Sequence, residues 1–498
     1  MRYNSTRGSR PMATSSEVIF QGIAADGGLF IPEETPKLTL QELAACGKYE
    51  YAERAYEILG RFLTDFTADE LQGCITRAYN SQKFSHGAIT PLHKLDEQRS
   101  ILELWHGPTF AFKDLALQIL PQFMITAMTK LGVTGEVVIL VATSGDTGKA
   151  ALAGFEDVGS TRIIVFYPAE GVSTIQKCQM VTQTGSNTFV VAVEGNFDAA
   201  QRGVKEIFTD PHMISQLADC NKHFSSANSI NWGRLVPQIV YYFSAYLDLV
   251  QAGRIALGDR INVVVPTGNF GNILAAYYAR GMGLPIDRLI TASNKNDVIA
   301  QFINTGVYDR RRPFFQTLSP SMDILVSSNL ERLLYELTDR DAKLIKTWMM
   351  ELATKGAYQV PARVLKSIQS IFWAGACTDQ RTLTTIKSVY ANYGYVVDPH
   401  TAVALDVYEQ YVEQTQDSTH TVIASTASPL KFVESVTQAL FGSEALVGMD
   451  EFELIKLLEE RTGLTVPQGL QSLQRMPRRH KRKCLPQEMP QVVMELLK

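Results

Sequence analysis

The chain has 498 residues and an ordinary globular composition, with 45% hydrophobic, 20% charged and 9% aromatic residues. This composition excludes collagen-like, low-complexity and disordered chains. The formal net charge of −4 leaves no general basic excess that would bind nucleic acid through its phosphates. At ~150 residues per domain, the length predicts about three domains.

The six cysteines are far apart and form no CxxC pair, which argues against a disulfide scaffold or a zinc cluster and indicates a reducing compartment. The longest uncharged stretch, 261–279, contains Pro266, three asparagines and two glycines, so we expect no membrane-spanning helix. The basic run Arg475–Lys483 is interpreted as a solvated face, with a nucleic-acid patch or localisation signal as the alternative.

In chain order, the first ~95 residues are predicted to be mostly helical, apart from a loop at Gly22–Pro32. Short β-rich runs and helical patterns then alternate, and region 327–397 is rich in helix. We predict helices at 197–208, 233–252 and 452–460. The predicted strands are Glu136–Ala142, Thr161–Tyr167, Thr188–Val193, Ile261–Val265, Arg288–Ala292 and Thr421–Ser425. This alternation predicts an α/β protein with a mostly parallel sheet.

Ligands of parallel sheets bind at the carboxyl ends of the strands, so the turns that follow strands are the places to look for chemistry. The turn Val265–Asn272 (VPTGNFGN) leads into a helix, and its glycines and amides suit a phosphate. An ordinary tight turn is the alternative. The turn Ala142–Lys149 (ATSGDTGK) lacks the Walker A pattern and suits a carboxylate or a phosphate. Its alternative is a capped helix start with Ser144 or Asp146 as N-cap.

Three further segments carry reactive or anion-binding side chains. Lys113 lies among apolar neighbours in WHGPTFAFKDL, which lowers the pKa of its amine and favours attack on a carbonyl; a lysine that reaches the surface is the alternative. The segment Ser226–Arg234 offers a hydroxyl, an amide and a guanidinium that match a phosphate, or else a helix cap with an exposed arginine. The segment Ile423–Phe432 places hydroxyls after a strand, or forms a capped turn.

One ligand with a carbonyl, a phosphate and a polar ring atom would serve all five segments, and pyridoxal phosphate has these groups. The motifs resemble those of threonine synthases, which are fold-type II pyridoxal-phosphate enzymes. The matching motifs are STRG (5–8), DGGLFIP (26–32), HGPTFAFKD (106–114), TSGDTG (143–148), NSINWGR (228–234) and PTGNFGN (266–272). The resemblance begins at the N-terminus, so we expect no cleaved transit peptide.

The resemblance implies a tryptophan synthase β-like fold with two parallel-sheet lobes and an N-terminal helical region. It divides the chain into a helical domain (1–95), a catalytic core (96–445, smaller lobe about 136–215) and a C-terminal extension (446–498).

The resemblance also assigns the site. Lys113 would carry the cofactor and act as the catalytic base. The remaining cofactor-binding residues would be Gly268, Asn269, Phe270, Gly271, Asn272 and Thr426. The substrate-binding residues would be Thr143, Ser144, Asp146, Thr147, Ser229, Asn231 and Arg234, and no metal is expected. After Thr426-Ala427 this chain has Ser428-Pro429-Leu430, where relatives carry His-Pro-Ala.

The implied activity is that of a carbon–oxygen lyase acting on phosphate, in which O-phospho-L-homoserine and water give L-threonine and phosphate, the last step of threonine biosynthesis. A phospho-lyase that releases 2-oxobutyrate is the alternative within the same chemistry. A nucleotide-binding or regulatory α/β protein that does not need Lys113 is the alternative from another class. We expect a cytoplasmic protein that acts on a small molecule and needs neither nucleic acid nor membrane; monomer and homodimer both remain open.

Overall fold

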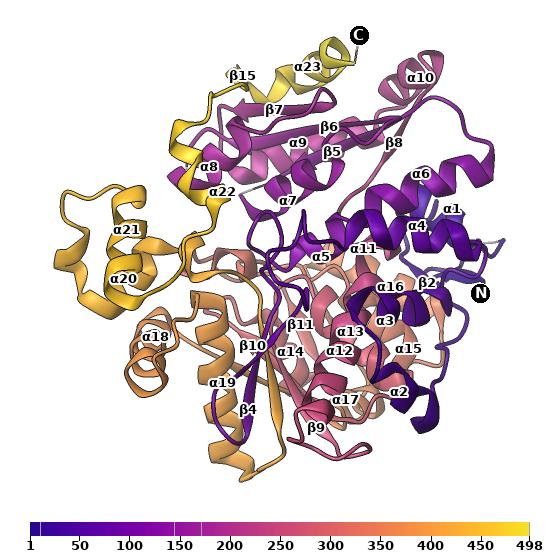
Figure 1. Ribbon diagram of the computed structural model, residues 1–498. Helices are drawn as coiled ribbons and strands as arrows, with labels where there is room; N and C mark the ends of the chain where they lie inside the picture. The colour runs from indigo at the N-terminus through magenta and orange to yellow at the C-terminus, as the bar shows by residue number, and fades with distance from the viewer. Residues whose placement is uncertain (10, 144, 171, 498) are drawn as a thin grey trace.

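The computed structural model describes residues 1–9, 11–143, 145–170 and 172–497. Two mainly parallel sheets form the centre of the molecule (Figure 1). The larger sheet has the strand order β13-β10-β9-β14-β4-β3, and the smaller has the order β15-β7-β6-β5-β8. The predicted α/β class with two parallel-sheet lobes is therefore confirmed.

The larger sheet is parallel except for its edge strand β3, which pairs antiparallel with β4. Every residue of β9 and β14 is buried, as expected for apolar strands covered by helices on both faces. The strands are β3 (Leu92–Lys94), β4 (Arg99–Glu103), β9 (Ile261–Pro266), β10 (Ile286–Ser293), β13 (Phe372–Ala376) and β14 (Thr421–Ser425). The helices between them are α12 (Pro237–Gln251), α13 (Gly271–Gly281), α14 (Val298–Thr305), α18 (Asp379–Tyr393) and α19 (Pro399–Thr415).

The smaller sheet is parallel throughout and takes strands from distant parts of the chain. Its strands are β5 (Glu136–Ala142), β6 (Thr161–Pro168), β7 (Thr188–Val193), β8 (Lys222–Ser225) and β15 (Arg482–Cys484). Its helices are α7 (Asp146–Phe155), α8 (Thr174–Val181), α9 (Phe197–Thr209) and α10 (Pro211–Asp219). Strand β15 belongs to the proline-broken tail, where the sequence reading placed no strand, so the C-terminal segment is part of this lobe's sheet.

The N-terminal region is mostly helical, as predicted, and lies on the right in Figure 1. The predicted loop at Gly22–Pro32 ends in a strand, because β2 (Phe30–Pro32) pairs antiparallel with β1 (Tyr3–Ser5). The helices here are α1 (Ser15–Gln21), α2 (Leu40–Cys46), α3 (Tyr51–Gly60) and α4 (Ala68–Ala78), followed by α5 (Lys113–Leu117) and α6 (Leu120–Leu131).

The single helix predicted at 233–252 is wrong, because the structure divides it into α11 (Trp232–Leu235) and α12. Pro237 starts α12; since proline has no N–H to donate, it is placed well at a helix start and poorly inside one.

The remaining elements lie in the second half of the chain. They are β11 (Val307–Asp309), η1 (Pro320–Met322), α15 (Leu330–Leu337), α16 (Ala342–Lys355), β12 (Ala357–Gln359), α17 (Ala362–Gln369), η2 (Pro429–Lys431), α20 (Val433–Phe441), η3 (Ser443–Leu446), α21 (Glu451–Thr462), α22 (Gln468–Gln471), η4 (Leu473–Arg475), η5 (Pro486–Glu488) and α23 (Met489–Leu496).

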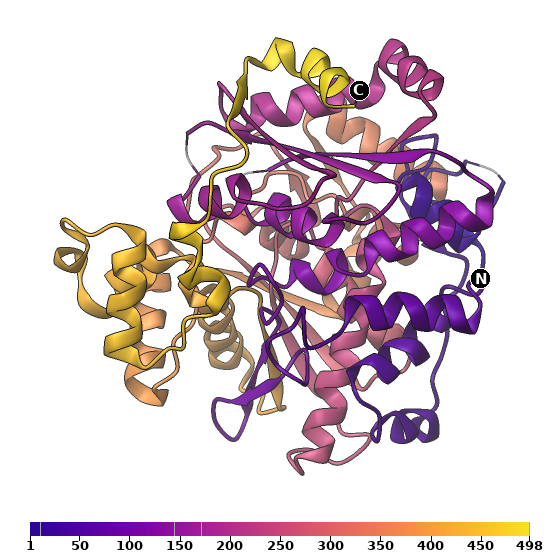
Figure 2. The same cartoon turned by 45° about the horizontal axis from the view of Figure 1, so that its top comes forward.

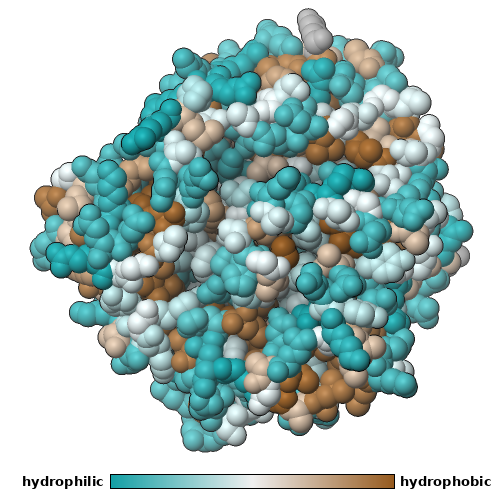
Figure 3. All heavy atoms as spheres, in the orientation of Figure 1, coloured by the Kyte–Doolittle hydropathy of each residue, from teal (hydrophilic) through white to brown (hydrophobic). Residues whose placement is uncertain are grey.

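The C-terminal extension connects the two lobes, and its yellow ribbon runs from α21 up to the smaller sheet in both views (Figures 1 and 2). The Glu451 carboxylate accepts the N–H groups of Thr174 (2.6 Å) and Ile175 (3.0 Å) and so caps helix α8. On the face shown in Figure 3, apolar side chains are scattered among polar ones. No helix in the described part of the chain is long and apolar enough to cross a membrane.

Candidate active site

Lys113 is the first residue of α5 and lies where the two lobes meet. Its side chain is only 11% exposed, and its Nζ lies 3.5 Å from Asp146 Oδ2 and 3.3 Å from Ser321 Oγ. Burial lowers the pKa of the Lys113 amine, the Asp146 carboxylate opposes this, and the charges of Lys431 and Arg234 add to it. Lys113 is therefore a buried amine that is easier to deprotonate than an ordinary lysine, and the surface alternative does not apply.

The backbone before Lys113 is fixed by the segment that follows β14. Phe112 N–H donates to Thr426 O at 2.9 Å, and Ser428 N–H donates to Phe110 O at 3.0 Å. Phe110 has a left-handed φ of +61°, which is uncommon for a bulky residue and occurs where surrounding contacts hold it. These bonds place the predicted cofactor residue Thr426 directly beside the start of α5.

Thr426 is buried, and its hydroxyl makes no hydrogen bond among the described residues, whereas the neighbouring hydroxyls are already used. Ser425 Oγ accepts from Trp105 Nε1 and from Thr401 Oγ1, both at 3.0 Å. Ser428 Oγ accepts from Leu430 N–H at 3.3 Å. Of the three hydroxyls in this segment, that of Thr426 is the one left for a ligand.

The loop after β5 brings Asp146 to Lys113. Asp146 is the first residue of α7, and its Oδ1 accepts from Gln176 Nε2 at 3.0 Å. Thr143 Oγ1 accepts from Gly145 N–H and Gly148 N–H, both at 3.0 Å, so this hydroxyl holds the loop in shape. Thr147 is half-buried, and its hydroxyl makes no hydrogen bond within the described chain. Ser144, the other predicted member of this loop, lies outside the described residues.

Asp146 is an ionised carboxylate despite its burial. Burial alone would raise the pKa of Asp146, but the ammonium groups of Lys431 and Lys113 outweigh it and hold the pKa well below its usual range. Lys431 Nζ lies 2.8 Å from Asp146 Oδ1. Asp146 is thus already paired with cations of the chain, and a substrate carboxylate would be repelled by it.

The loop after β9 forms a compact turn at the start of α13. A Cβ atom on Gly268 would lie 3.0 Å from Ser321 O and 3.3 Å from Met322 Cα, so the close approach of the 319–323 segment favours glycine there. Phe270 has a φ of +63° and precedes the first turn of α13. Asn269 is exposed, and its carbonyl oxygen accepts from the backbone and side-chain N–H groups of Asn329.

Asn272 lies in the first turn of α13 with its amide only partly used. Its Oδ1 accepts from the hydroxyls of Tyr241 and Tyr242, while its buried Nδ2 has no partner in the described part of the chain. A helix start with an unpartnered donor attracts an anion, since unpaired buried N–H groups are unfavourable. The turn therefore fits the phosphate of the cofactor.

In the NSINWGR segment, Asn231 holds the loop in shape, while Ser229 and Arg234 keep donors for a ligand. Asn231 caps α11: its Oδ1 accepts from Gly233 N–H at 2.8 Å, and its Nδ2 donates to Ile19 O and Ser226 O, both at 3.0 Å. Ser229 Oγ accepts from Asn329 Nδ2 at 3.3 Å. Asn231 therefore shapes the turn, and its amide donors are not free.

Arg234 is 3% exposed, and no carboxylate of the described chain lies within ion-pair distance of it. One amino group donates to Ala227 O, and its Nε has no partner among the residues that the structure describes. Burial lowers the pKa of Arg234 to about 10, which still leaves the guanidinium charged. An unpaired buried cation is unfavourable, so this residue is arranged for an anionic ligand, and the exposed-arginine alternative does not apply.

Several residues around this site were missed by sequence reasoning. They are Lys431, Ser321, Gln176, His400, Asn329 and Arg332. Lys431 lies five residues after Thr426 in an apolar segment, which was a usable signal. The others carry no motif of their own in the sequence, and tertiary contacts bring them to the site.

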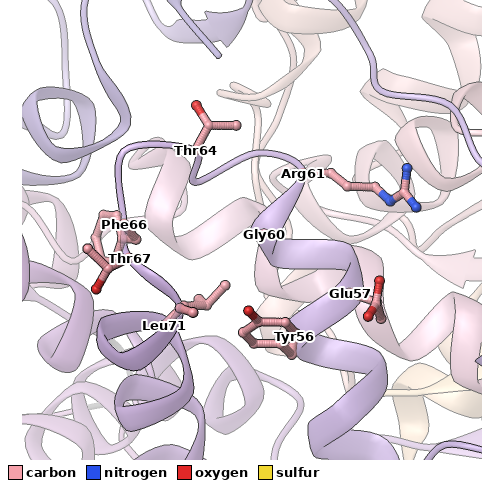
Figure 4. Close-up of a pocket in the computed structure, with 9 residues that line it drawn as sticks. Tyr56, Glu57, Gly60, Arg61, Thr64, Phe66, Thr67 and Leu71 are labelled. Atoms are coloured by element: carbon pink, nitrogen blue, oxygen red, sulfur yellow. The ribbon is translucent and has the colours of Figure 1, made fainter.

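The side chains present fit pyridoxal phosphate. Lys113 offers an amine, the start of α13 offers an unpartnered donor, Thr426 offers a hydroxyl, and Arg234 remains for a second anion. The described residues contain no group of three or more His, Cys, Asp or Glu side chains that could hold a metal ion. A surface hollow of about 380 Å³ lies elsewhere, between α3 and α4 (Figure 4), and none of the predicted site residues lines it.

Comparisons with known proteins agree with this arrangement. Residues 2–79 match the family model of the threonine synthase N terminus, residues 84–426 match that of pyridoxal-phosphate dependent enzymes, and residues 401–488 match that of the threonine synthase C-terminal region. The threonine synthase of Pseudomonas aeruginosa is 39% identical over 443 residues, which are 89% of this chain and 91% of that protein. The chain belongs to the threonine synthase family.

Further threonine synthase relatives agree in sequence and fold. Human threonine synthase-like 1 is 43% identical over 436 residues, which are 85% of this chain. The chain spans only 58% of the length of that human relative. The crystal structure of a pyridoxal-phosphate-bound threonine synthase from Brucella melitensis superimposes with a TM-score of 0.89 and 36% identity, over all of both chains. The yeast threonine synthase also gives a TM-score of 0.89, with 32% identity, over 100% of this chain and 98% of that chain. These likenesses confirm the predicted fold-type II architecture.

Proposed function

We propose that this chain is a pyridoxal-phosphate-dependent carbon–oxygen lyase that converts O-phospho-L-homoserine and water into L-threonine and phosphate. The observation that carries this proposal is a buried amine, Lys113, within electrostatic reach of a buried and unpaired guanidinium, Arg234. The family supports both the cofactor and the reaction. An amine that deprotonates readily suits a carbonyl cofactor, and an unpaired guanidinium suits a phosphorylated substrate.

The cofactor, when bound, supplies an electron sink for negative charge at the substrate Cα. Lys113 would hold the cofactor aldehyde. The Gly268–Asn272 turn would hold its phosphate through the start of α13 and Asn272 Nδ2, which has no partner among the described residues. Thr426 would face the ring nitrogen with a neutral hydroxyl.

The same amine would serve the proton steps of the substrate. Once released from the cofactor, the Lys113 amine can take the proton from the substrate Cα and return it at the end. Burial lowers the pKa of the Lys113 amine, which favours the neutral form that can act as a base. Ser321 Oγ, 3.3 Å from Lys113 Nζ, holds this amine in place between the steps.

The phosphate and the carboxylate of the substrate would be bound by two different motifs. Arg234 and Ser229 would hold the substrate phosphate, while Asn231 keeps their loop in shape through its three hydrogen bonds. The substrate carboxylate would be received by Thr147 and the backbone at Thr143, next to the start of α7. The predicted role of Ser144 falls outside the described residues. We assign Asp146 to the lysines, because its carboxylate is already paired with them.

We also propose that the protein works in the cytoplasm as a catalyst for a small molecule. All six cysteines are free thiols, which suits a reducing compartment.

Spectra and product analysis of the purified protein test the function. The protein should be yellow, and borohydride should fix the cofactor to Lys113. With phosphohomoserine it should release phosphate and threonine in equal amounts. Label on another lysine would contradict the site, and 2-oxobutyrate as the main product would favour the phospho-lyase alternative instead.

A further inference from the structure

Lys431 is a buried lysine that the proposed reaction leaves without a role. Its side chain is 0% exposed, and its Nζ donates to Thr109 O at 2.7 Å and lies 2.8 Å from Asp146 Oδ1. Lysine is almost never fully buried unless it is paired, so this ammonium is held by the carboxylate and the carbonyl together.

The Asp146 carboxylate lies between this ammonium and the amine of Lys113. One oxygen is 2.8 Å from Lys431 Nζ and 3.0 Å from Gln176 Nε2. The other is 3.5 Å from Lys113 Nζ and 3.1 Å from Ser321 Oγ. The carboxylate therefore makes a short ion pair with Lys431 and only a long contact with Lys113.

We propose that Lys431 is a positioning residue for the reaction: its ammonium holds Asp146 and offsets the charge of that carboxylate, so that Lys113 remains available as a neutral amine. This inference rests on the proposed function, in which Lys113 must form a covalent bond with a carbonyl. A lone carboxylate at the same distance would instead bind Lys113 as an ammonium ion, because opposite charges in a water-poor site attract strongly.

Other charged groups also face this cluster. Arg234 of α11 lies within electrostatic reach of Lys113. His400 of α19, which contacts Asp398, lies within electrostatic reach of Asp146. Asp114 of α5 lies within electrostatic reach of Lys431, as does Lys149 of α7. Within the described chain none of these makes an ion pair with Lys113 or Asp146, and the substitutions below leave all of them in place.

The test is the visible absorbance of the cofactor-loaded, full-length protein as a function of pH. This absorbance reports whether the nitrogen that joins Lys113 to the cofactor carries a proton. Lys431→Met removes the offsetting charge and keeps the side chain long and apolar. The midpoint of the absorbance change should rise by roughly 1–3 pH units, because the uncompensated carboxylate stabilises the protonated nitrogen.

Two further variants test the direction in which charge shifts the midpoint. Lys431→Arg keeps the charge and should leave the midpoint within about half a unit of wild type, while Asp146→Asn should lower the midpoint because it leaves Lys431 uncompensated beside Lys113. If Lys431 had only a structural role, its replacement would lower the melting temperature. Lys431→Met and Asp146→Asn would then not shift the midpoint in opposite directions. If Lys431→Met does not fold, the Asp146→Asn shift alone decides.

The outcomes separate this inference from the proposed function. Borohydride labelling of wild-type Lys113 tests the proposed function by itself. If Lys113 is labelled but Lys431→Met leaves the midpoint of the absorbance change in place, the proposed role of Lys431 is wrong. If Lys431→Met does not fold, an unchanged midpoint in Asp146→Asn leads to the same conclusion. If Lys113 is not labelled in wild type, the proposed function and this inference fail together.

Discussion

At the scale of single residues, the predicted site contains buried polar groups that have no hydrogen-bond partner among the described residues. Arg234 Nε and Asn272 Nδ2 are such groups, and the hydroxyl of buried Thr426 makes no hydrogen bond there either, whereas the neighbouring Asn231 and Ser425 side chains are hydrogen-bonded. An unpaired buried donor is unfavourable, so these three groups, which lie among the predicted site residues, are suited to contact a ligand there.

Arg234→Met tests this at the substrate phosphate. Loss of a charge-assisted hydrogen bond, about 1.5–3 kcal/mol, should lower kcat/KM on phosphohomoserine by roughly 10- to 100-fold. The melting temperature of the free protein should stay equal or rise, because an unpaired buried charge is removed. Arg54 is the matched control: it is also buried but pairs with Asp248 at 2.6 Å, so Arg54→Met should lower the melting temperature. Unchanged kcat/KM in Arg234→Met would refute the assignment.

Thr426 gives a second residue-level prediction. A neutral hydroxyl does not hold a proton on the ring nitrogen, whereas a carboxylate would. Thr426→Asp should therefore raise ring protonation and shift products toward transamination, and Thr426→Ser should be mild. The measurements are an absorption spectrum and a product ratio for each variant. If Thr426→Ala matches wild type in cofactor affinity and product ratio, another group faces the ring nitrogen.

At the scale of elements, the position of Lys113 depends on how closely α7 packs on α5. Gly154 of α7 makes this approach possible, since a Cβ there would lie 2.0 Å from Leu117 O at the end of α5. That atom belongs to the backbone and cannot rotate away, so α5 and α7 would have to move apart.

Gly154→Ala should therefore destabilise the protein by about 1–3 kcal/mol and lower the activity, because α5 carries Lys113 and α7 carries Asp146. Gly159→Ala is the control, since a Cβ there meets nothing within 4 Å, and its effect should stay within about 0.5 kcal/mol. Chemical unfolding of both variants makes the comparison. Equal stability of the two would show that the helices can separate without strain.

At the scale of the whole molecule, the C-terminal extension links the two lobes behind the site. Glu451 caps α8, Gln176 of α8 donates to Asp146, and Asp146 contacts Lys113. Strand β15 extends the sheet of the same lobe by pairing with β7. The extension thus supports the site through the smaller lobe without contributing a predicted site residue.

Glu451→Gln should test this link. Loss of the charge at the start of α8 should destabilise the protein by about 0.5–2 kcal/mol and lower the cofactor affinity, since α8 holds Gln176. Glu459→Gln is the matched control, because Glu459 lies on the exposed side of α21, the helix that also carries Glu451. It should change neither the stability nor the cofactor affinity. Thermal unfolding and cofactor titration of both variants give the answer; equal cofactor affinities would separate the extension from the site.

The strands and the turns that follow them can be predicted from the sequence, and the residue types of those turns point to the site proposed above. Strands β5, β7 and β14 have the predicted bounds, because continuous apolar runs between polar turns admit few alternatives. Lys113 in its apolar segment and the glycine turn at 268–272 can also be recognised in the sequence, because both features depend on residues that are close together in the chain.

Contacts between distant segments show which side chains are already hydrogen-bonded and which residues far apart in sequence surround the site. Asn231 and Arg234 looked equivalent in one motif, yet Asn231 bonds within the chain and Arg234 Nε does not. Lys431 meets Asp146 across 285 positions of sequence, and β15 pairs with β7 across almost 300. Charge pairing and edge-strand pairing depend on distances in space, and local patterns carry no information about them.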